Sequence, residues 1–198
     1  ADMMMPELAG LKKEHLIGVV LKYDQEKEKK SSVELNAKKG AGNIASEVSF
    51  IGAGNFAQNA ILPRIKDKCS FRGIITAEGN MSRYVADKYG FNYCAASIDE
   101  ILQDEKVGTV FIVTRHNTHA RYAAQTLNAG KNVYIEKPLA MSKEELEEVK
   151  VAYEKSNGNL MLGFNRRFSP LIMKVKELFL TEQKKAINIR VNAGVVPP

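Results

Sequence analysis

Short apolar runs alternate with longer amphipathic stretches from Glu47 onward. Runs of three to six residues predict strands at Val48–Ile51, Phe71–Thr76, Phe91–Cys94, Thr109–Val113, Val133–Ile135 and Leu160–Gly163. Strands that alternate with helices form a parallel sheet, and right-handed crossovers place helices on both of its faces. The pattern therefore predicts an α/β fold with a doubly wound (Rossmann) parallel sheet over residues 47–165.

Local signals mark where several helices begin and end. Ser97 with Glu100, and Ser142 with Glu145, fit the S-x-x-E capping box that starts a helix. Gly130 follows an alanine-rich stretch, where a helix C-terminal glycine belongs. Apolar residues recur at helical spacing at Leu146, Val149 and Tyr153.

The region before Glu47 does not follow this pattern. Residues 1–23 end in the apolar run Leu16–Tyr23, which predicts one strand, either the tail of an upstream domain or an added edge strand. Residues 24–46 are rich in Lys, Glu, Ser, Gly and Asn, which predicts a linker. Within it, Ser32–Asn36 predicts a brief strand, whereas GAGN at Gly40–Asn43 follows no apolar strand and is not a dinucleotide loop.

Residues 166–198 form a third region. Leu171–Leu180 predicts a helix, and Ala186–Ala193 alternates between apolar and polar positions as a strand does. A strand that is followed at once by the end of the sequence has no partners nearby. We therefore expect the start of a second, incomplete α/β domain here.

The first chemical motif is G-x-G-x-x-A, which follows the apolar run Val48–Ile51 and precedes a predicted helix. The first glycine permits a tight turn, the second lets the backbone approach a pyrophosphate, and the alanine lets the helix pack close to the strand. N–H groups at the helix N-terminus attract the phosphates. The alternative is an ordinary strand–helix turn. The predicted cofactor contacts in this loop are Gly52, Gly54, Asn55, Phe56 and Ala57.

The position that contacts the ribose is predicted at Thr76, where the second strand of this fold ends. An NAD-preferring site usually places Asp or Glu there. Thr76 has no carboxylate to repel a 2′-phosphate, Glu78 comes two residues later, and Arg83 follows further on. The choice between NAD and NADP therefore stays open.

Two more clusters follow predicted strands, and ligands of doubly wound sheets lie beyond the carboxyl ends of the strands. The first supplies the candidate cofactor contacts Thr114, Arg115, His116 and His119. For His119, packing or capping of its own helix is an equally good interpretation. The second cluster is Glu136–Lys137–Pro138, in which Glu136 and Lys137 are further candidate cofactor contacts. Lys137 is also a cationic donor suited to a substrate hydroxyl. The alternative for Lys137 is a solvated surface lysine.

Composition narrows the function classes. The formal net charge is +6, but lysines are scattered or alternate with glutamate, and aromatic residues do not interleave with arginines, which argues against nucleic-acid binding. No apolar stretch is long enough to predict a signal peptide or a membrane segment. The two cysteines form no CxxC pair, so no metal site is predicted, and a reduced cytoplasmic protein is expected.

Four strings together resemble one family. They are GAGNFA, TRHNTH, GKNVYIEKPLA and GFNRRFSP, and they span the chain from about Glu47 onward. In this combination the sequence resembles the Gfo/Idh/MocA oxidoreductases, the relatives of glucose–fructose oxidoreductase and inositol dehydrogenase. EKPLA is the most specific of the strings, and the glycine loop the least.

The resemblance implies a Rossmann domain that binds NAD or NADP, followed by an antiparallel α/β domain that holds the substrate. It implies that Lys137 lies at the nicotinamide edge and that the bond before Pro138 is cis. Family members often read T-P-N-x-x-H, from which Arg115 and His116 depart. The family's remaining catalytic residues, usually an Asp and a His, would lie beyond Pro198. The start of the chain resembles two-part bacterial proteins with an upstream alcohol-dehydrogenase-like half.

These features predict the cofactor domain of a dehydrogenase that transfers hydride between NAD(P) and a sugar or polyol. Lys137 is the predicted catalytic residue, and the isolated chain is expected to be inactive. The alternative function is a non-catalytic dinucleotide-binding or sensor module. The sequence does not determine the oligomeric state.

Overall fold

The computed structural model describes residues 32–35, 47–179, 188 and 190. The chain divides into two units, Ala1–Ser31 and Ser32–Pro198, and every described residue belongs to the second unit. The predicted strand Leu16–Tyr23 lies outside the described residues. So do most of the predicted linker and almost all of the predicted strand Ala186–Ala193.

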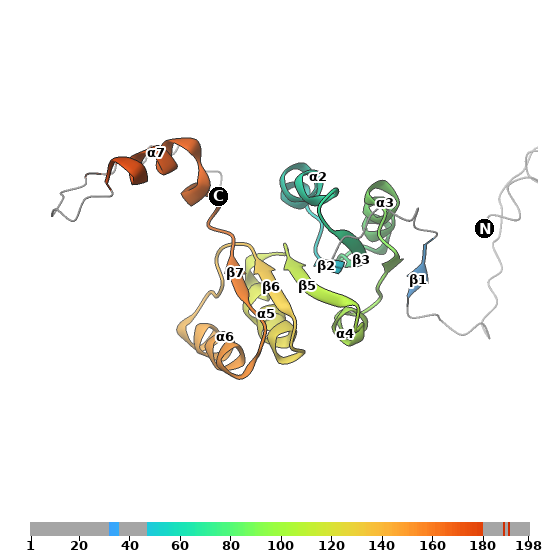
Figure 1. Cartoon of the computed structure of the whole chain (residues 1–198). Coiled ribbons are helices and arrows are strands. Elements are labelled where there is room, and N and C mark those ends of the chain that lie inside the picture. Colours follow the sequence, from blue (N-terminus) through green and yellow to red (C-terminus); the bar gives the residue numbers. More distant parts are fainter. Residues whose placement is uncertain (1–31, 36–46, 180–187, 189, 191–198) are drawn as a thin grey trace, which may run out of the picture. The chain divides into compact units, whose positions relative to one another are not determined.

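One seven-stranded sheet forms the centre of the described region (Figure 1). Its strands are β1 (Val33–Glu34), β2 (Glu47–Ile51), β3 (Ser70–Ile75), β4 (Tyr93–Cys94), β5 (Val107–Ile112), β6 (Asn132–Ile135) and β7 (Leu160–Leu162). Their order is β1-β4-β3-β2-β5-β6-β7. Only β1 is antiparallel to its neighbour among these strands. The predicted doubly wound α/β fold is confirmed, and each strand predicted between Glu47 and Gly163 is present.

The connections from β2 first run outward through β3 to β4, and then return to start again at β5 on the other side of β2. The helical elements are η1 (Ala57–Ile61, a π-helix), α2 (Leu62–Ile65), α3 (Gly79–Tyr89), α4 (Ile98–Gln103), η2 (His116–Thr118), α5 (His119–Asn128), α6 (Lys143–Lys155), η3 (Asn165–Phe168) and α7 (Pro170–Leu178). None of these helices is long and apolar enough to cross a bilayer.

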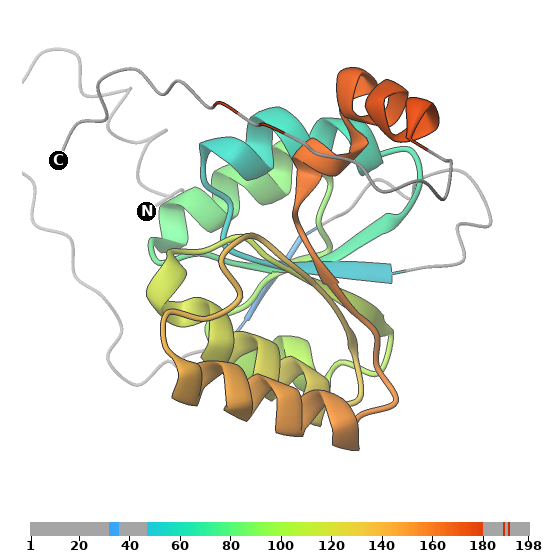
Figure 2. The same cartoon turned by 90° about the vertical axis from the view of Figure 1, so that its left-hand side faces the viewer.

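Helices cover both faces of the sheet (Figure 2). On one face, α2 and α3 pack on an aromatic row that crosses four strands, in which Phe50 stacks on Phe111 and meets Phe71 edge-on, and Tyr134 lies beside Phe111. On the other face, α5 and α6 pack on a core of aliphatic strand residues. Alternate residues of each strand point to opposite faces, so β2 supplies Phe50 to the first core and Ile51 to the second.

The helix signals are confirmed with one exception. Ser142 Oγ accepts the N–H of Glu145, and the Glu145 carboxylate accepts the N–H of Met141. Gly130 has a φ of 71° directly after the helix α5, a conformation that favours glycine. Ser97 makes no side-chain cap. At this helix only the Glu100 half of the capping box forms, in which the Glu100 carboxylate accepts a hydrogen bond from the Ala96 N–H.

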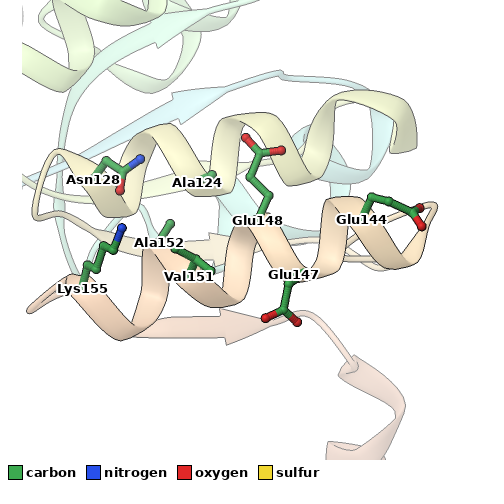
Figure 3. Close-up of a pocket in the computed structure, with 8 residues that line it drawn as sticks. All are labelled: Ala124, Asn128, Glu144, Glu147, Glu148, Val151, Ala152 and Lys155. Carbon is green, nitrogen blue, oxygen red and sulfur yellow. The ribbon is translucent and has the colours of Figure 1, made fainter.

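The buried face of α6 differs from the predicted apolar stripe. Val149 is buried, but Leu146 and Tyr153 are exposed. The side of α6 that faces inward carries the small residue Ala152, which lies towards Ala124 of the neighbouring helix α5 (Figure 3). Small side chains on both helices allow this close packing. The sequence therefore predicted the helix correctly and its buried face only in part.

The brief strand predicted within the linker is present as β1. Val33 and Glu34 pair with Cys94 and Tyr93 of β4, and the Leu35 N–H donates to the Asn92 carbonyl at 2.8 Å. This pairing covers the edge of β4, which would otherwise present unpaired backbone groups.

Candidate functional site

The carboxyl ends of neighbouring strands bring the predicted site residues to one edge of the sheet. Backbone hydrogen bonds tie these ends together: Gly52 N–H to Ile75 O at 2.8 Å, Val113 N–H to Ile51 O at 2.9 Å, and Glu136 N–H to Ile112 O at 3.1 Å. The glycine loop, Thr76, the segment from Thr114 and the Glu136–Pro138 loop therefore follow adjacent strands. This edge includes the point between β2 and β5 where the strand order reverses, which is where such sheets bind ligands.

Gly52 makes the turn out of β2. Its φ of 92° lies in the region that favours glycine, and a Cβ at this position would lie against the Val113 carbonyl and Thr114 Cγ2 of the neighbouring strand end. Both the backbone conformation and the close approach of β5 therefore require glycine.

Gly54 has a different environment. It is exposed, and a Cβ added to it would meet no atom of another described segment within 4 Å. Asn55 and Phe56 are also exposed at the start of the helical segment, whereas Ala57 is fully buried against the first core. A bare backbone that opens to solvent at a helix start fits a pyrophosphate, which contacts N–H groups where a side chain would block it.

Thr76 follows β3, and its side chain closes the turn into α3. The Thr76 hydroxyl donates to Glu78 O at 2.6 Å and lies 2.8 Å from Ser82 Oγ, which also accepts the Thr76 N–H. Glu78 is exposed at the N-cap of α3, and Arg83 forms an ion pair with Asp87. No carboxylate occupies the end of β3 at position 76 itself.

The segment after β5 forms a compact turn. Thr114 Oγ1 lies 2.7 Å from Thr118 Oγ1, and the Thr118 hydroxyl donates to Arg115 O at 2.8 Å. Arg115 and His116 are exposed on this turn. Their side chains are therefore accessible from solvent at the ligand-binding edge.

His119, the first residue of α5, has no exposed surface. Its Nδ1 lies 2.6 Å from Pro138 O and its Nε2 lies 3.2 Å from Thr114 O. Both ring nitrogens therefore face backbone carbonyls of the two neighbouring loops. In this arrangement neither ring nitrogen is directed at a ligand. His119 packs its helix, as the sequence allowed, and its ring also contacts the two neighbouring loops.

The loop after β6 carries Glu136, Lys137 and Pro138, and the Lys137–Pro138 bond is cis. Lys137 is exposed, and within the described residues its side chain forms no ion pair or hydrogen bond. The Glu136 carboxylate accepts the Tyr134 hydroxyl at 2.8 Å. Burial, and then this hydrogen bond to Glu136, raise the pKa of Tyr134 above its ordinary value.

Sequence reasoning missed Tyr134 and Gly163. A Cβ on Gly163 would lie 2.7 Å from Glu136 Oε1 and 2.9 Å from the Tyr134 hydroxyl, so only glycine leaves room for this pair. A signal was present, because residues two apart on a strand point to the same side, which places Tyr134 beside Glu136.

Residues 46–164, more than half of the chain, match the model of the GFO_IDH_MocA family, described as an oxidoreductase family with an NAD-binding Rossmann fold. The chain belongs to the Gfo/Idh/MocA oxidoreductase family. It is an oxidoreductase domain whose cofactor is NAD or NADP.

Relatives within the Gfo/Idh/MocA family match only in part of their length. Oxidoreductase P35 of Formosa agariphila is 28% identical over 131 residues, which are 65% of this chain and 41% of that protein. Myo-inositol 2-dehydrogenase of Thermotoga maritima is 30% identical over 95 residues, 48% of this chain and 28% of that protein. A dehydrogenase (MviM) from Clostridium difficile superposes with a TM-score of 0.61 and 31% identity over 67% of this chain and 44% of its own. The chain thus spans about two fifths of the length of relatives such as oxidoreductase P35.

Proposed function

We propose that this chain is the cofactor domain of a dehydrogenase that acts on a hydroxyl-bearing carbon of a sugar or polyol. Membership of an NAD-binding oxidoreductase family supports the cofactor, and the likeness to a myo-inositol 2-dehydrogenase supports the substrate class. The observation that carries the proposal is that an exposed glycine backbone at Gly54 and an exposed cation at Lys137 follow strands that end at the same edge of the sheet.

The chain's residues have separate tasks in this proposal. The Gly52–Ala57 loop contacts the pyrophosphate, Thr76 lies at the ribose, and the exposed side chains of Arg115 and His116 border the cofactor between them. The nicotinamide, when bound, supplies the hydride chemistry. Lys137 donates a hydrogen bond to the reacting oxygen of the substrate and stabilises the negative charge that develops there.

We also propose the division of the chain into domains. Residues 47–165 are the cofactor domain and residues 166–198 begin the substrate domain. Residues 24–46 are a linker, and residues 1–23 are the tail of an upstream domain or an added edge strand. The helix α7 supports the second boundary because it has no buried residue, and Leu171 and Leu178 are 78% and 71% exposed. Apolar surface of this kind is usually covered by a further part of a protein. Without that part, the isolated chain has no turnover.

The alternative function is a non-catalytic dinucleotide-binding or sensor module. The glycine loop serves either function equally well. Lys137 favours the dehydrogenase, since binding a dinucleotide does not require a cation at the end of β6.

Titration of the 198-residue chain with NADH and NADPH by calorimetry tests the cofactor site. We expect binding by the unaltered chain and its loss in Gly54→Val, where the new side chain would occupy the space of the pyrophosphate. Gly108→Val is the matched control, because a Cβ there meets only Glu47 O at 3.9 Å, at the opposite edge of the sheet. No binding of either cofactor at millimolar concentration would contradict the proposal.

A further inference from the structure

The position of Lys137 depends on its neighbours, because its own side chain has no partner within the described residues. One residue earlier, the Glu136 N–H donates to Ile112 O at 3.1 Å and fixes the loop to β5. One residue later, Pro138 O lies 2.6 Å from His119 Nδ1. Lys137 is therefore held between two anchors, one made by the sheet and the other by a buried imidazole.

The second anchor is directional. Both atoms that face the ring are carbonyl oxygens, which only accept hydrogen bonds, whereas a neutral imidazole has one N–H donor. With the proton on Nδ1, which makes the shorter of the two contacts, His119 would donate to Pro138 O. Nε2 lies at the longer distance of 3.2 Å from Thr114 O.

The burial of His119 excludes direct proton exchange with a ligand in this arrangement. The ring has 0% exposed surface and is enclosed at the start of α5, between the loops that follow β5 and β6. A buried imidazole whose nitrogens are both directed at backbone can transmit position but has no free atom for a reacting group.

We infer that His119 is a positioning residue, which holds the Lys137 loop against the β5 loop and so sets where the Lys137 ammonium lies. This inference rests on the proposed role of Lys137 for its functional meaning. Its structural content, that the ring holds the loop, is independent of cofactor binding.

Two substitutions separate the hydrogen bond from mere packing. An asparagine amide places its nitrogen near the position of a histidine Nδ1, so His119→Asn keeps a donor for Pro138 O, whereas His119→Leu fills the space without one. Leu127→Val is the matched control: Leu127 is also fully buried on α5 but packs in the core away from the loop.

The readout is amide hydrogen exchange in the 198-residue chain, expressed as the exchange rate of Glu136 relative to that of Phe111 in the middle of β5. Loss of one buried hydrogen bond should raise this ratio about tenfold in His119→Leu. His119→Asn should restore it to within about threefold of the unaltered chain, and Leu127→Val should leave it unchanged, because general destabilisation affects both amides. An unchanged ratio in His119→Leu, or no rescue by asparagine, would overturn the inference.

A measurement on the unaltered chain covers the case in which a variant does not fold. Two-bond ¹H–¹⁵N correlations of the His119 ring show which nitrogen carries a proton. A protonated Nδ1 supports the inference, and a bare Nδ1 overturns it because Pro138 O would then have no donor. NADH titration in parallel distinguishes failure of the proposed function, since a chain that binds no cofactor can still show the loop anchored by His119.

Discussion

The hydroxyl of Tyr134 donates a hydrogen bond of 2.8 Å to the carboxylate of Glu136. Tyr134 lies on β6, which pairs with β7. Gly163, directly after β7, makes room for both groups. The Glu136 side chain, in the loop that carries Lys137, thus has its space limited by a residue that follows the next strand.

Gly163→Ala should destabilise the fold by about 1–3 kcal/mol, since its Cβ would lie 2.7 Å from Glu136 Oε1 and one partner must move. Urea unfolding measures the loss. In a double-mutant cycle with Tyr134→Phe, the two effects should be non-additive, because removing the hydroxyl relieves part of the crowding. Strict additivity would mean that the two residues do not share this space.

Lys137→Ala should sharply lower the turnover of a longer protein that contains this domain, and leave NADH affinity nearly unchanged. The lysine lies at the end of β6, away from the glycine loop, and would interact most strongly when charge develops on the substrate oxygen. Lys137→Arg should not restore turnover, because a planar guanidinium does not replace a compact ammonium. Lys143→Ala, on the exposed start of α6, is the control. Steady-state kinetics that are unchanged in Lys137→Ala would favour the sensor function.

Thr76→Asp should reduce NADPH affinity relative to NADH affinity by about tenfold or more, because a carboxylate at the end of β3 repels a 2′-phosphate and binds ribose hydroxyls. Thr76→Asn has nearly the same shape without the charge and serves as the control. Fluorescence titration with both cofactors gives the ratio. Equal effects of Asp and Asn would place the ribose elsewhere.

Asp104 should make the stability of the fold sensitive to acid. Its carboxylate accepts hydrogen bonds from Arg72 at 2.7 Å and from Tyr93 at 3.1 Å. Burial by itself raises the pKa of Asp104, but the hydrogen bond from Arg72 and the Lys106 N–H outweigh burial and bring it below its ordinary value.

Because the folded pKa of Asp104 is depressed, its stabilisation is present above the unfolded pKa of about 4 and is lost as the pH falls through the folded value. Asp104→Asn should therefore lower the free energy of unfolding at pH 7 by about 1–3 kcal/mol and flatten its decrease below pH 4. Asp67→Asn, at an exposed turn, is the control. Urea midpoints between pH 3 and pH 7 test this, and a parallel acid dependence in both variants would contradict it.

Local patterns in the sequence were sufficient for the order of strands and helices and for the glycine loop. The short apolar run over residues 109–113 predicts β5 because a strand that is buried on both faces is apolar throughout. Gly52 was predicted as a turn residue for the reason that the structure confirms, a backbone conformation that other residues rarely adopt. Such signals depend on a few neighbouring residues, and the sequence contains them directly.

Only the tertiary structure decided where particular side chains point. His119 allowed two interpretations until the β6 loop placed Pro138 O beside its Nδ1, and Leu146 proved exposed because α6 packs on α5 through small residues. The role of Gly163 became visible only from its contacts with Tyr134 on β6 and with Glu136, the residue that follows this strand. These contacts join residues from different elements, and the packing between those elements determines them. Periodicity and local conformation therefore do not predict them.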